Sequence, residues 1–239
     1  MLIGREALIA GFFAQVGAGN TVLIHGPWGV GKSALLAELL RRWRASGRPC
    51  GLAPRTTALG DVTRALANAY PKVSAEGRPQ RHLRSSLRMA VEANPGVLLL
   101  DHLASNGTAL KGFLRSLRGT GLGVLMAADV EDQRDRDRVR AFGLAYREIE
   151  VPSLPERHLR ELLEAHLTRR SLPSELADPD RGALITMARG RPGWIRSLVE
   201  RLASPRYWAG QGVLLELLRC DLSLEVMNHY LRARDREDP

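Results

Sequence analysis

A glycine-rich stretch of eight residues constrains this chain more than any other feature. It reads Gly26-Pro27-Trp28-Gly29-Val30-Gly31-Lys32-Ser33 and fits the pattern G-x-x-x-x-G-K-[ST] completely. Glycines let the backbone curl so that successive N–H groups point at one anion, at the positive end of the following helix. An apolar run at 21–25 precedes the stretch, and leucines at helical spacing follow it. This context predicts a nucleotide phosphate site rather than an ordinary turn, with Lys32 reaching the β- and γ-phosphates and the Ser33 hydroxyl coordinating Mg²⁺.

Alternating strand and helix signals predict an α/β architecture for most of the chain. Apolar, β-favouring runs are expected as strands at 21–25, 49–53, 97–101, 123–128 and 146–151. Helical spacing of apolar residues separates these runs, with the clearest examples at 33–44 and 81–94. Four consecutive apolar residues at 97–100 suit a central parallel strand that is covered on both faces. The predicted fold class is a three-layer P-loop NTPase with a parallel sheet.

The last third of the chain is expected to be helical, because no strand is evident after Pro152. Helices are predicted at 156–170, 181–189 and 192–203, followed by a terminal pair at 213–218 and 222–231. The predicted organisation is an α/β domain over 1–152, a small helical domain over 153–204, and C-terminal helices with a frayed tail over 205–239.

Composition narrows the class of protein without identifying a partner. Of the 239 residues, 44% are hydrophobic, which excludes disorder for most of the length, and no apolar run approaches the roughly 20 residues of a membrane span. The first residues reach charge and glycine too early for a secretory signal. Two distant cysteines match no metal spacing, so a reduced, cytoplasmic setting is expected. The net charge of +9 permits a polyanionic partner, but only three of the 35 basic residues are lysines, a skew that a GC-rich genome also produces.

A second polar position follows the buried run at 97–100. Asp101, at the carboxyl end of that strand, is predicted to hold the Mg²⁺ shell across from Ser33, and a capping or turn aspartate is the alternative. Many P-loop ATPases continue with a glutamate that orients the attacking water, whereas this chain has His102. A histidine accepts a proton at neutral pH, so His102 is a candidate base; a strand-end histidine without a catalytic task is equally compatible. Slow hydrolysis, or binding without turnover, follows from the second interpretation.

These residues resemble those of an AAA+ ATPase, in the branch shared by origin-recognition ATPases, bacterial transposition-regulator ATPases and STAND signalling ATPases. The resemblance covers about residues 2–204, with a Walker A stretch at 26–33 and a Walker B stretch at 97–101. Leu2-Ile3-Gly4-Arg5-Glu6 resembles the "GRE" box whose backbone lies against adenine in this branch. The resemblance implies ATP and Mg²⁺ as cofactors, Gly4 and Arg5 at the nucleotide, and a helical lid domain.

The same resemblance assigns a sensor 1 position and an arginine finger. The run at 123–129 falls where the sensor 1 strand is expected, and Asp129 is its polar tip in place of the usual asparagine, serine or threonine. In the family, an arginine near the end of the next helix points into the neighbouring subunit's site, and Arg138 or Arg140 matches best. The alternative is a solvated charged helix, since four acidic residues are interleaved with its arginines.

A sensor 2 turn is the third assignment. The stretch at 188–195 resembles it, with Gly193 in the place of the usual arginine, a departure shared with STAND-like members. Arg189 or Arg191 is a candidate substitute. Pro192 and Ile195 are expected to pack on the adenine ring.

Two functions from different classes fit these features. The leading one is a Mg-ATP-dependent AAA+ switch that assembles into a homo-oligomer, in the manner of a short transposition regulator that binds duplex DNA without reading sequence. Two basic groups could contact phosphates, although each is also compatible with a solvated helix face: Arg81, Arg84 and Arg88, and Arg41, Arg42, Arg44 and Arg48.

The alternative function is a STAND-like signalling or scaffolding protein that uses ATP as a latch and acts through a partner protein. His102 and Gly193 favour it, because both weaken the case for efficient turnover. A small-molecule P-loop kinase fits the Walker A stretch alone, and the helical lid and the box at 4–6 argue against it.

Overall fold

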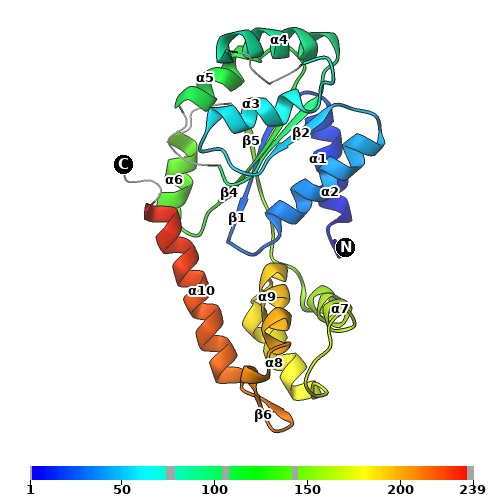
Figure 1. The fold of residues 1–239 in the computed structure, drawn as a ribbon, viewed down its shortest axis with the longest axis vertical. Helices are drawn as coiled ribbons and strands as arrows, with labels where there is room; N and C mark the ends of the chain where they lie inside the picture. Colours follow the sequence, from blue (N-terminus) through cyan, green and yellow to red (C-terminus); the bar gives the residue numbers. More distant parts are fainter. Residues whose placement is uncertain (1, 74–78, 104–107, 142–144, 236–239) are drawn as a thin grey trace.

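A parallel β-sheet occupies the centre of the N-terminal part of the chain in the computed structural model (Figure 1). The structure describes residues 2–73, 79–103, 108–141 and 145–235. Within these ranges the sheet has five strands in the order β2-β3-β4-β1-β5, and each neighbouring pair is parallel. The strands are β1 (Thr21–Gly26), β2 (Cys50–Ala53), β3 (Val97–Leu100), β4 (Gly123–Asp129) and β5 (Arg147–Glu150). Their carboxyl ends therefore meet at one edge of the sheet, where β1 enters the glycine-rich loop.

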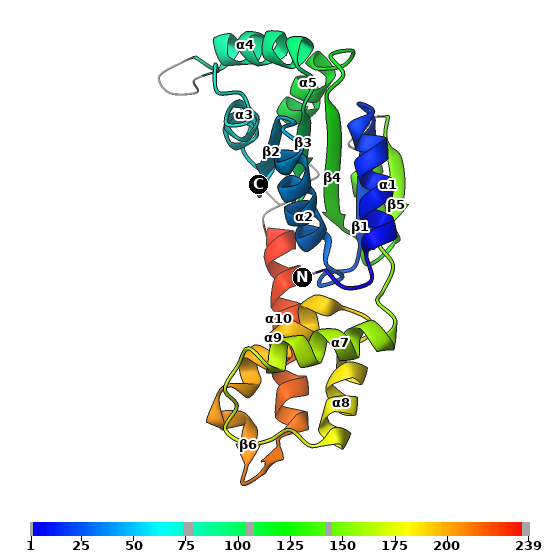
Figure 2. The ribbon, with the colours of Figure 1, turned by 90° about the vertical axis from the view of Figure 1, so that its right-hand side faces the viewer.

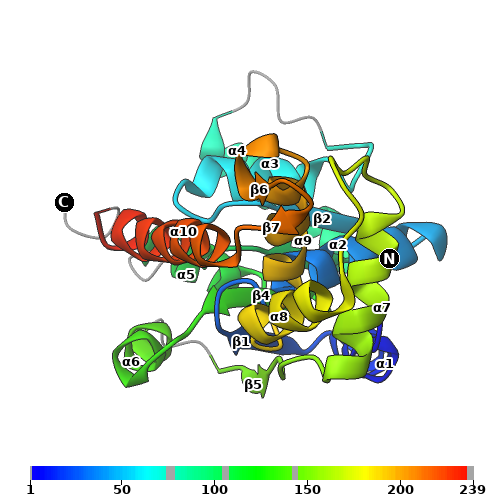
Figure 3. The same ribbon diagram turned by 90° about the horizontal axis from the view of Figure 1, so that it is seen from below.

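Helices cover both faces of this sheet, which confirms the three-layer α/β fold. The apolar side chains of α1 (Glu6–Gly17) and α2 (Lys32–Ala45) share one core with Val97 and Leu99 of β3. Alternate residues of the same strand, Leu98 and Leu100, belong to the core on the other face. That core is completed by α3 (Leu59–Ala67), α4 (Gln80–Ala93) and α5 (Thr108–Ser116). Seen from below, α1 and α2 lie on one side of the sheet and α5 on the other (Figure 3).

A separate apolar core holds the helical region together. Its helices are α7 (Glu156–Leu167), α8 (Asp178–Ala188) and α9 (Pro192–Leu202), each within three residues of the predicted bounds. Leu163, Leu184, Ile195 and Leu198 are fully buried among them. Figure 2 shows these helices grouped beneath the edge at which the strands end. The helical region thus faces the glycine-rich loop.

The C-terminal segment differs from the prediction in two ways. A short hairpin of β6 (Trp208–Ala209) and β7 (Gly212–Val213) follows a 3-10 turn, so the expectation of no strand after Pro152 is wrong. The expected pair of helices is also wrong, because one helix, α10 (Leu215–Asp235), runs through the predicted break and into the tail that was expected to fray. No glycine or proline occurs between Leu215 and Asp235, so nothing in the backbone stops the helix there. Residues 236–239 of the predicted tail lie outside the described ranges.

None of the helices in the described ranges is both long and apolar enough to cross a bilayer.

Candidate nucleotide-binding site

The glycine-rich loop adopts a conformation that its glycines make accessible. Gly26, Gly29 and Gly31 have φ angles of 150°, 86° and 103°, a region in which a side chain is strained. Gly31 is the N-cap residue of α2 and has no side chain that could cap the N–H groups of that helix end. Val30 between them is fully buried, which fixes the loop against the core. The N–H groups at the start of α2 are therefore positioned to receive an anion.

Lys32 is held tightly at the end of this loop. Its Nζ donates to the carbonyl oxygens of Gly26 and Pro27 at 2.6 and 2.9 Å, and it pairs with Asp129 Oδ1 at 2.7 Å. A lysine ammonium has three donors, so these partners engage all of them. The side chain is only 6% exposed.

Asp129, the predicted sensor 1 residue, lies among Lys32 and two histidines. β1 and β4 pair in register, with Gly26 opposite Asp129, and this places the carboxylate beside the loop. Its Oδ2 is 3.2 Å from His229 Nε2 and 3.8 Å from His102 Nδ1. Burial alone would raise the pKa of Asp129, but His102, His229 and Lys32 together hold it well below its usual range. The sequence marked Asp129 as a sensor; its ion pair with Lys32 was not anticipated.

Asp101 and His102 follow β3 at the same edge of the sheet. Asp101 is 8% exposed, and its Oδ1 accepts the backbone N–H of His102 at 3.0 Å. His102 has a φ of 49° and a half-exposed side chain. The carboxylate of Asp129, and after it that of Asp101, raises the pKa of His102, so more of its imidazole is protonated at neutral pH and less of it is in the neutral form that a general base needs.

Ser33 and Asp101, the residues predicted to bind Mg²⁺, fit a site in which nucleotide phosphates supply further ligands. Ser33 is exposed on the first turn of α2, and Asp101 directly follows β3 at the edge of the sheet where the strands end. Within the described ranges, no group of three or more His, Cys, Asp or Glu side chains has the geometry of a preformed metal cage. Mg²⁺ commonly uses one or two protein oxygens together with substrate phosphates and water, so one hydroxyl and one carboxylate suffice.

The predicted GRE box joins the loop to the helical region. Arg5 is 3% exposed and donates to the carbonyl oxygen of Val30 at 3.1 Å, and burial lowers its pKa. Gly4 has a φ of 67°, and the ring of His158 on α7 packs so closely that a Cβ at Gly4 would overlap it. Arg5 therefore holds the loop at Val30 through a buried hydrogen bond.

The start of α9 rests directly on the loop. The N–H of Gly193 donates to the carbonyl oxygen of Gly29 at 2.8 Å, and a Cβ at Gly193 would lie 3.0 Å from the backbone of Gly29. Pro192 packs against Gly31, and Ile195 is fully buried in the core of the helical region. Gly193, which stands at the predicted sensor 2 position, therefore lies where a side chain would require the loop or α9 to shift.

Arg191 connects the helical region to the loop. It donates to the carbonyl oxygen of Trp28 at 3.3 Å, pairs with Glu131 at 3.2 Å, and lies over the ring of Trp194 at 4.4 Å. Arg189, the other candidate substitute for the sensor 2 arginine, ends α8 with a φ of 48°. The structure therefore brings Arg191, and not Arg189, into contact with the loop.

The remaining predicted arginines divide into two groups. Arg138 and Arg140 lie on α6 (Gln133–Ala141), but their side chains are outside the described part of the chain, so the arginine finger stays a prediction. In the basic groups, several side chains already have protein partners. Arg41 and Arg42 both bind Glu38, Arg88 binds Glu92, and Arg48 donates to two backbone carbonyls.

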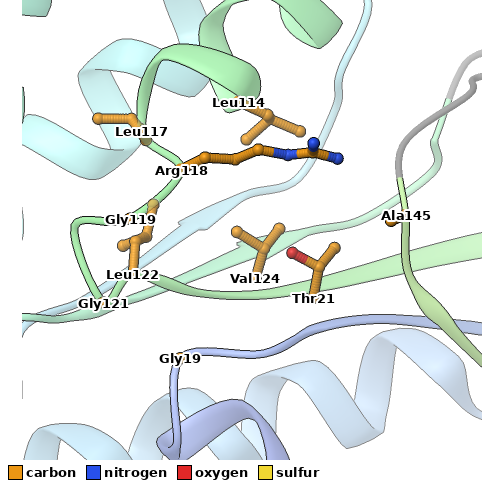
Figure 4. A pocket seen from close by; sticks show the side chains of 10 residues that line it. All are labelled: Gly19, Thr21, Leu114, Leu117, Arg118, Gly119, Gly121, Leu122, Val124 and Ala145. Atoms are coloured by element: carbon orange, nitrogen blue, oxygen red, sulfur yellow. The ribbon is translucent and has the colours of Figure 1, made fainter.

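Two hollows accompany the loop and the sheet. A polar one of about 300 Å³ flanks the loop, lined by His25, Glu131, Arg136 and Glu150 among others. The pKa of His25 is lowered by burial. A smaller cavity of about 110 Å³ lies at the opposite end of the strands, and Figure 4 shows the side chain of Arg118 extending across it above Val124 and Thr21. It is remote from every residue predicted for nucleotide binding.

Comparison with known proteins rests on structure, since no family model and no curated protein matches the sequence. The AMPPCP-bound DnaA from Aquifex aeolicus superposes on 83% of this chain at 16% identity and a TM-score of 0.51. The Aeropyrum pernix ORC1 protein in complex with DNA matches 93% of it at 15% identity and a TM-score of 0.57. A STAND protein with a tetratricopeptide repeat sensor from Pyrococcus horikoshii matches 92% at 12% identity and a TM-score of 0.54.

These similarities define the fold. The chain has the AAA+ P-loop ATPase fold, with the glycine-rich loop at the expected place between β1 and α2. It spans 61% of the DnaA chain, 66% of the ORC1 chain and 32% of the STAND chain.

Proposed function

We propose that this chain binds Mg-ATP at the glycine-rich loop and uses it as a conformational switch. One observation carries the proposal: a complete G-x-x-x-x-G-K-S stretch, with its glycines in left-handed conformations, joins β1 to α2 in an AAA+ fold. An ATP analogue is bound in the similar DnaA structure. In this proposal Lys32 and the first N–H groups of α2 neutralise the phosphates.

The chain's own residues then have defined tasks. Ser33 and Asp101 hold Mg²⁺, which neutralises phosphate charge when bound. Turnover is slow, because His102 stands where a glutamate base is usual and because two carboxylates favour its protonated form. If His102 is the general base, His102→Ala should lower turnover by about 100-fold or more, and an unchanged rate would remove His102 from the mechanism.

Titration calorimetry with Mg-ATP tests the binding step. Lys32→Ala is expected to weaken binding by about 100-fold or more, because it removes the charge that faces the phosphates. Lys72→Ala, which removes an exposed lysine elsewhere, is the matched control and should bind as the unmodified chain does. Asp101→Asn should keep binding while losing its dependence on Mg²⁺. Micromolar binding retained by Lys32→Ala would contradict the assignment of the loop.

Assembly on duplex DNA is the second part of the proposal. The similar ORC1 structure is a complex with DNA. Assembly has a separate test: a rise in specific ATPase activity with protein concentration would indicate an arginine that acts between copies of the chain. Fluorescence anisotropy of a labelled duplex, with and without Mg-ATP at two salt concentrations, tests DNA directly. Binding that requires ATP supports a transposition-type regulator. Absence of ATP-dependent DNA binding favours the alternative function, a STAND-like latch that acts on a partner protein. The similarity to the STAND structure and the contact of Gly193 with Gly29 support this alternative.

A further inference from the structure

The C-terminal helix reaches from the helical region to the phosphate loop. In Figure 1, α10 runs from the β6–β7 hairpin along the side of the molecule toward the part that holds the sheet. Its early part is fixed to the lid, where Tyr207 donates to Asp221 at 2.7 Å and Glu225 accepts hydrogen bonds from Ser197 and Arg201. Its later part therefore extends from a fixed base to the nucleotide site.

Two consecutive side chains of α10 contact the site itself. The imidazole of His229 stacks on the indole of Trp28, with ring centroids 4.6 Å apart and planes 23° from parallel. The same imidazole is 3.2 Å from Asp129 Oδ2. The hydroxyl of Tyr230 donates to Glu131 Oε1, which also accepts the backbone N–H of Trp28 at 3.0 Å. The end of α10 thus touches the loop and the residues that follow β4.

These contacts stabilise an arrangement in which the ammonium group of Lys32 has no donor left for a phosphate oxygen. Asp129 engages Lys32 through one oxygen and His229 through the other, so docking of α10 holds the carboxylate on the lysine. All three donors of Lys32 are engaged, and a phosphate oxygen gains one only if a present partner gives it up. A carboxylate on the lysine also repels an incoming polyphosphate.

We propose that the end of α10 is an inhibitory strap: its docking through His229 and Tyr230 competes with the binding of a nucleoside triphosphate at the loop. The inference rests on the proposed function, because it concerns the same site. Binding of a triphosphate draws Lys32 away from Asp129. The carboxylate is then no longer held in the position that His229 contacts, and the end of α10 leaves the loop. His229 and Tyr230 set the nucleotide affinity without contacting the nucleotide.

The double variant His229→Ala/Tyr230→Phe tests the strap by calorimetric titration with Mg-ATP. If the docked form makes up about 90% of the nucleotide-free protein, its removal tightens apparent binding about 10-fold. Met227→Ala is the matched control, because Met227 lies on the same helix, is 51% exposed and has no part in the docking. Tyr230→Phe alone removes one hydroxyl and is the milder variant, expected to give a smaller gain in the same direction.

The outcomes separate this inference from the proposed function. Tighter binding by the double variant than by the unmodified chain supports the strap, and binding by the double variant alone supports it more strongly. Equal affinities overturn the strap and leave ATP binding intact. If neither protein binds Mg-ATP, the proposed function fails and the strap fails with it.

Trp28 provides a readout that needs no nucleotide. A stacked imidazole alters the emission of an indole, so His229→Ala should change the nucleotide-free fluorescence, and Trp28→Phe identifies the part of the signal that belongs to Trp28. Emission from Trp28 that is unchanged by His229→Ala would show that α10 does not dock, and it would overturn the inference independently of ATP.

Discussion

The two halves of α10 are held by different kinds of contact. In the first half, Leu218 and Leu222 are 0% and 4% exposed and belong to the core of the helical region. In the second half, from Met227 onward, the side chains of Met227 and Leu231 are about half exposed. Among the side chains that the structure describes there, His229 and Tyr230 contact the rest of the protein, through a ring stack and polar groups.

The difference indicates two roles within one helix. The first half is an anchor, a part fixed in the core of the helical region, and the second half is a part that can undock when a ligand binds. A nucleotide at the loop offers no contacts that could replace the buried apolar contacts of the first half, so we expect this half to stay in place whatever the loop binds. Partly exposed polar contacts are individually weak and exchange readily for contacts with water or a ligand. The following experiments test whether the two halves differ in this way.

The largest effect is expected from the anchor. Leu218→Ala should lower the free energy of unfolding by about 3 kcal/mol, because it leaves a cavity in the apolar core. Met227→Ala on the solvent-facing part should change it by less than about 0.5 kcal/mol. Urea denaturation of both variants measures the contrast, and similar losses would show that the two halves are equally anchored.

Hydrogen exchange should resolve the two halves within one molecule. Without nucleotide, amides at 226–231 are expected to exchange at least about 10-fold faster than those at 217–222, which corresponds to about 1.4 kcal/mol in the free energy of local opening. Mg-ATP should increase exchange further at 226–231 and leave 217–222 unchanged. Uniform protection along α10, with and without nucleotide, would contradict the comparison.

Polar contacts in the first half should matter less than its apolar ones. Glu225→Ala removes the acceptor of Ser197 and Arg201 and should cost about 1 kcal/mol, since these groups are only partly buried. Ser223→Ala, which removes an exposed hydroxyl bonded within its own helix, is the control. A loss for Glu225→Ala as large as that for Leu218→Ala would show that polar contacts, and not the apolar core, fix the anchor.

The smallest effect is a pH dependence from His102 beside Asp129. The pKa of His102 is raised in the folded protein, so its contribution to stability is present below about pH 6.5 and is lost as pH rises through the folded pKa. Because the side chain is half exposed, a few tenths of a kcal/mol are expected. The pKa of His25 is lowered, so its effect has the opposite sign, and stability falls as pH drops below about 6.5.

Urea midpoints measured between pH 5.5 and 8.5 isolate this contribution. The difference between the unmodified chain and His102→Gln should shrink as pH rises, because His25 is common to both. A difference that grows with pH would show that Asp129 does not stabilise the protonated form of His102.

Local patterns sufficed for the sheet, its covering helices and the phosphate loop. The alternation that sends Val97 to one face and Leu98 to the other is a property of strand geometry, and the leucines at helical spacing are a property of helix geometry. The loop was predictable because Gly29, Gly31 and Lys32 act within one short stretch. The missed hairpin has the same origin, since strands of two residues are too short to show a period.

Side-chain contacts between distant segments were decided by the tertiary structure alone. By itself the sequence determined that Lys32 ends a phosphate loop and that Asp129 ends a strand. Only the parallel pairing of β1 with β4 brings the two together, and only the length and direction of α10 bring His229 and Tyr230 onto them. Gly193 likewise looked like a missing arginine until the lid was seen resting on Gly29. The physical reason is that periodicity reports what a residue does within its own element, whereas an ion pair or a stack depends on where two elements meet in space.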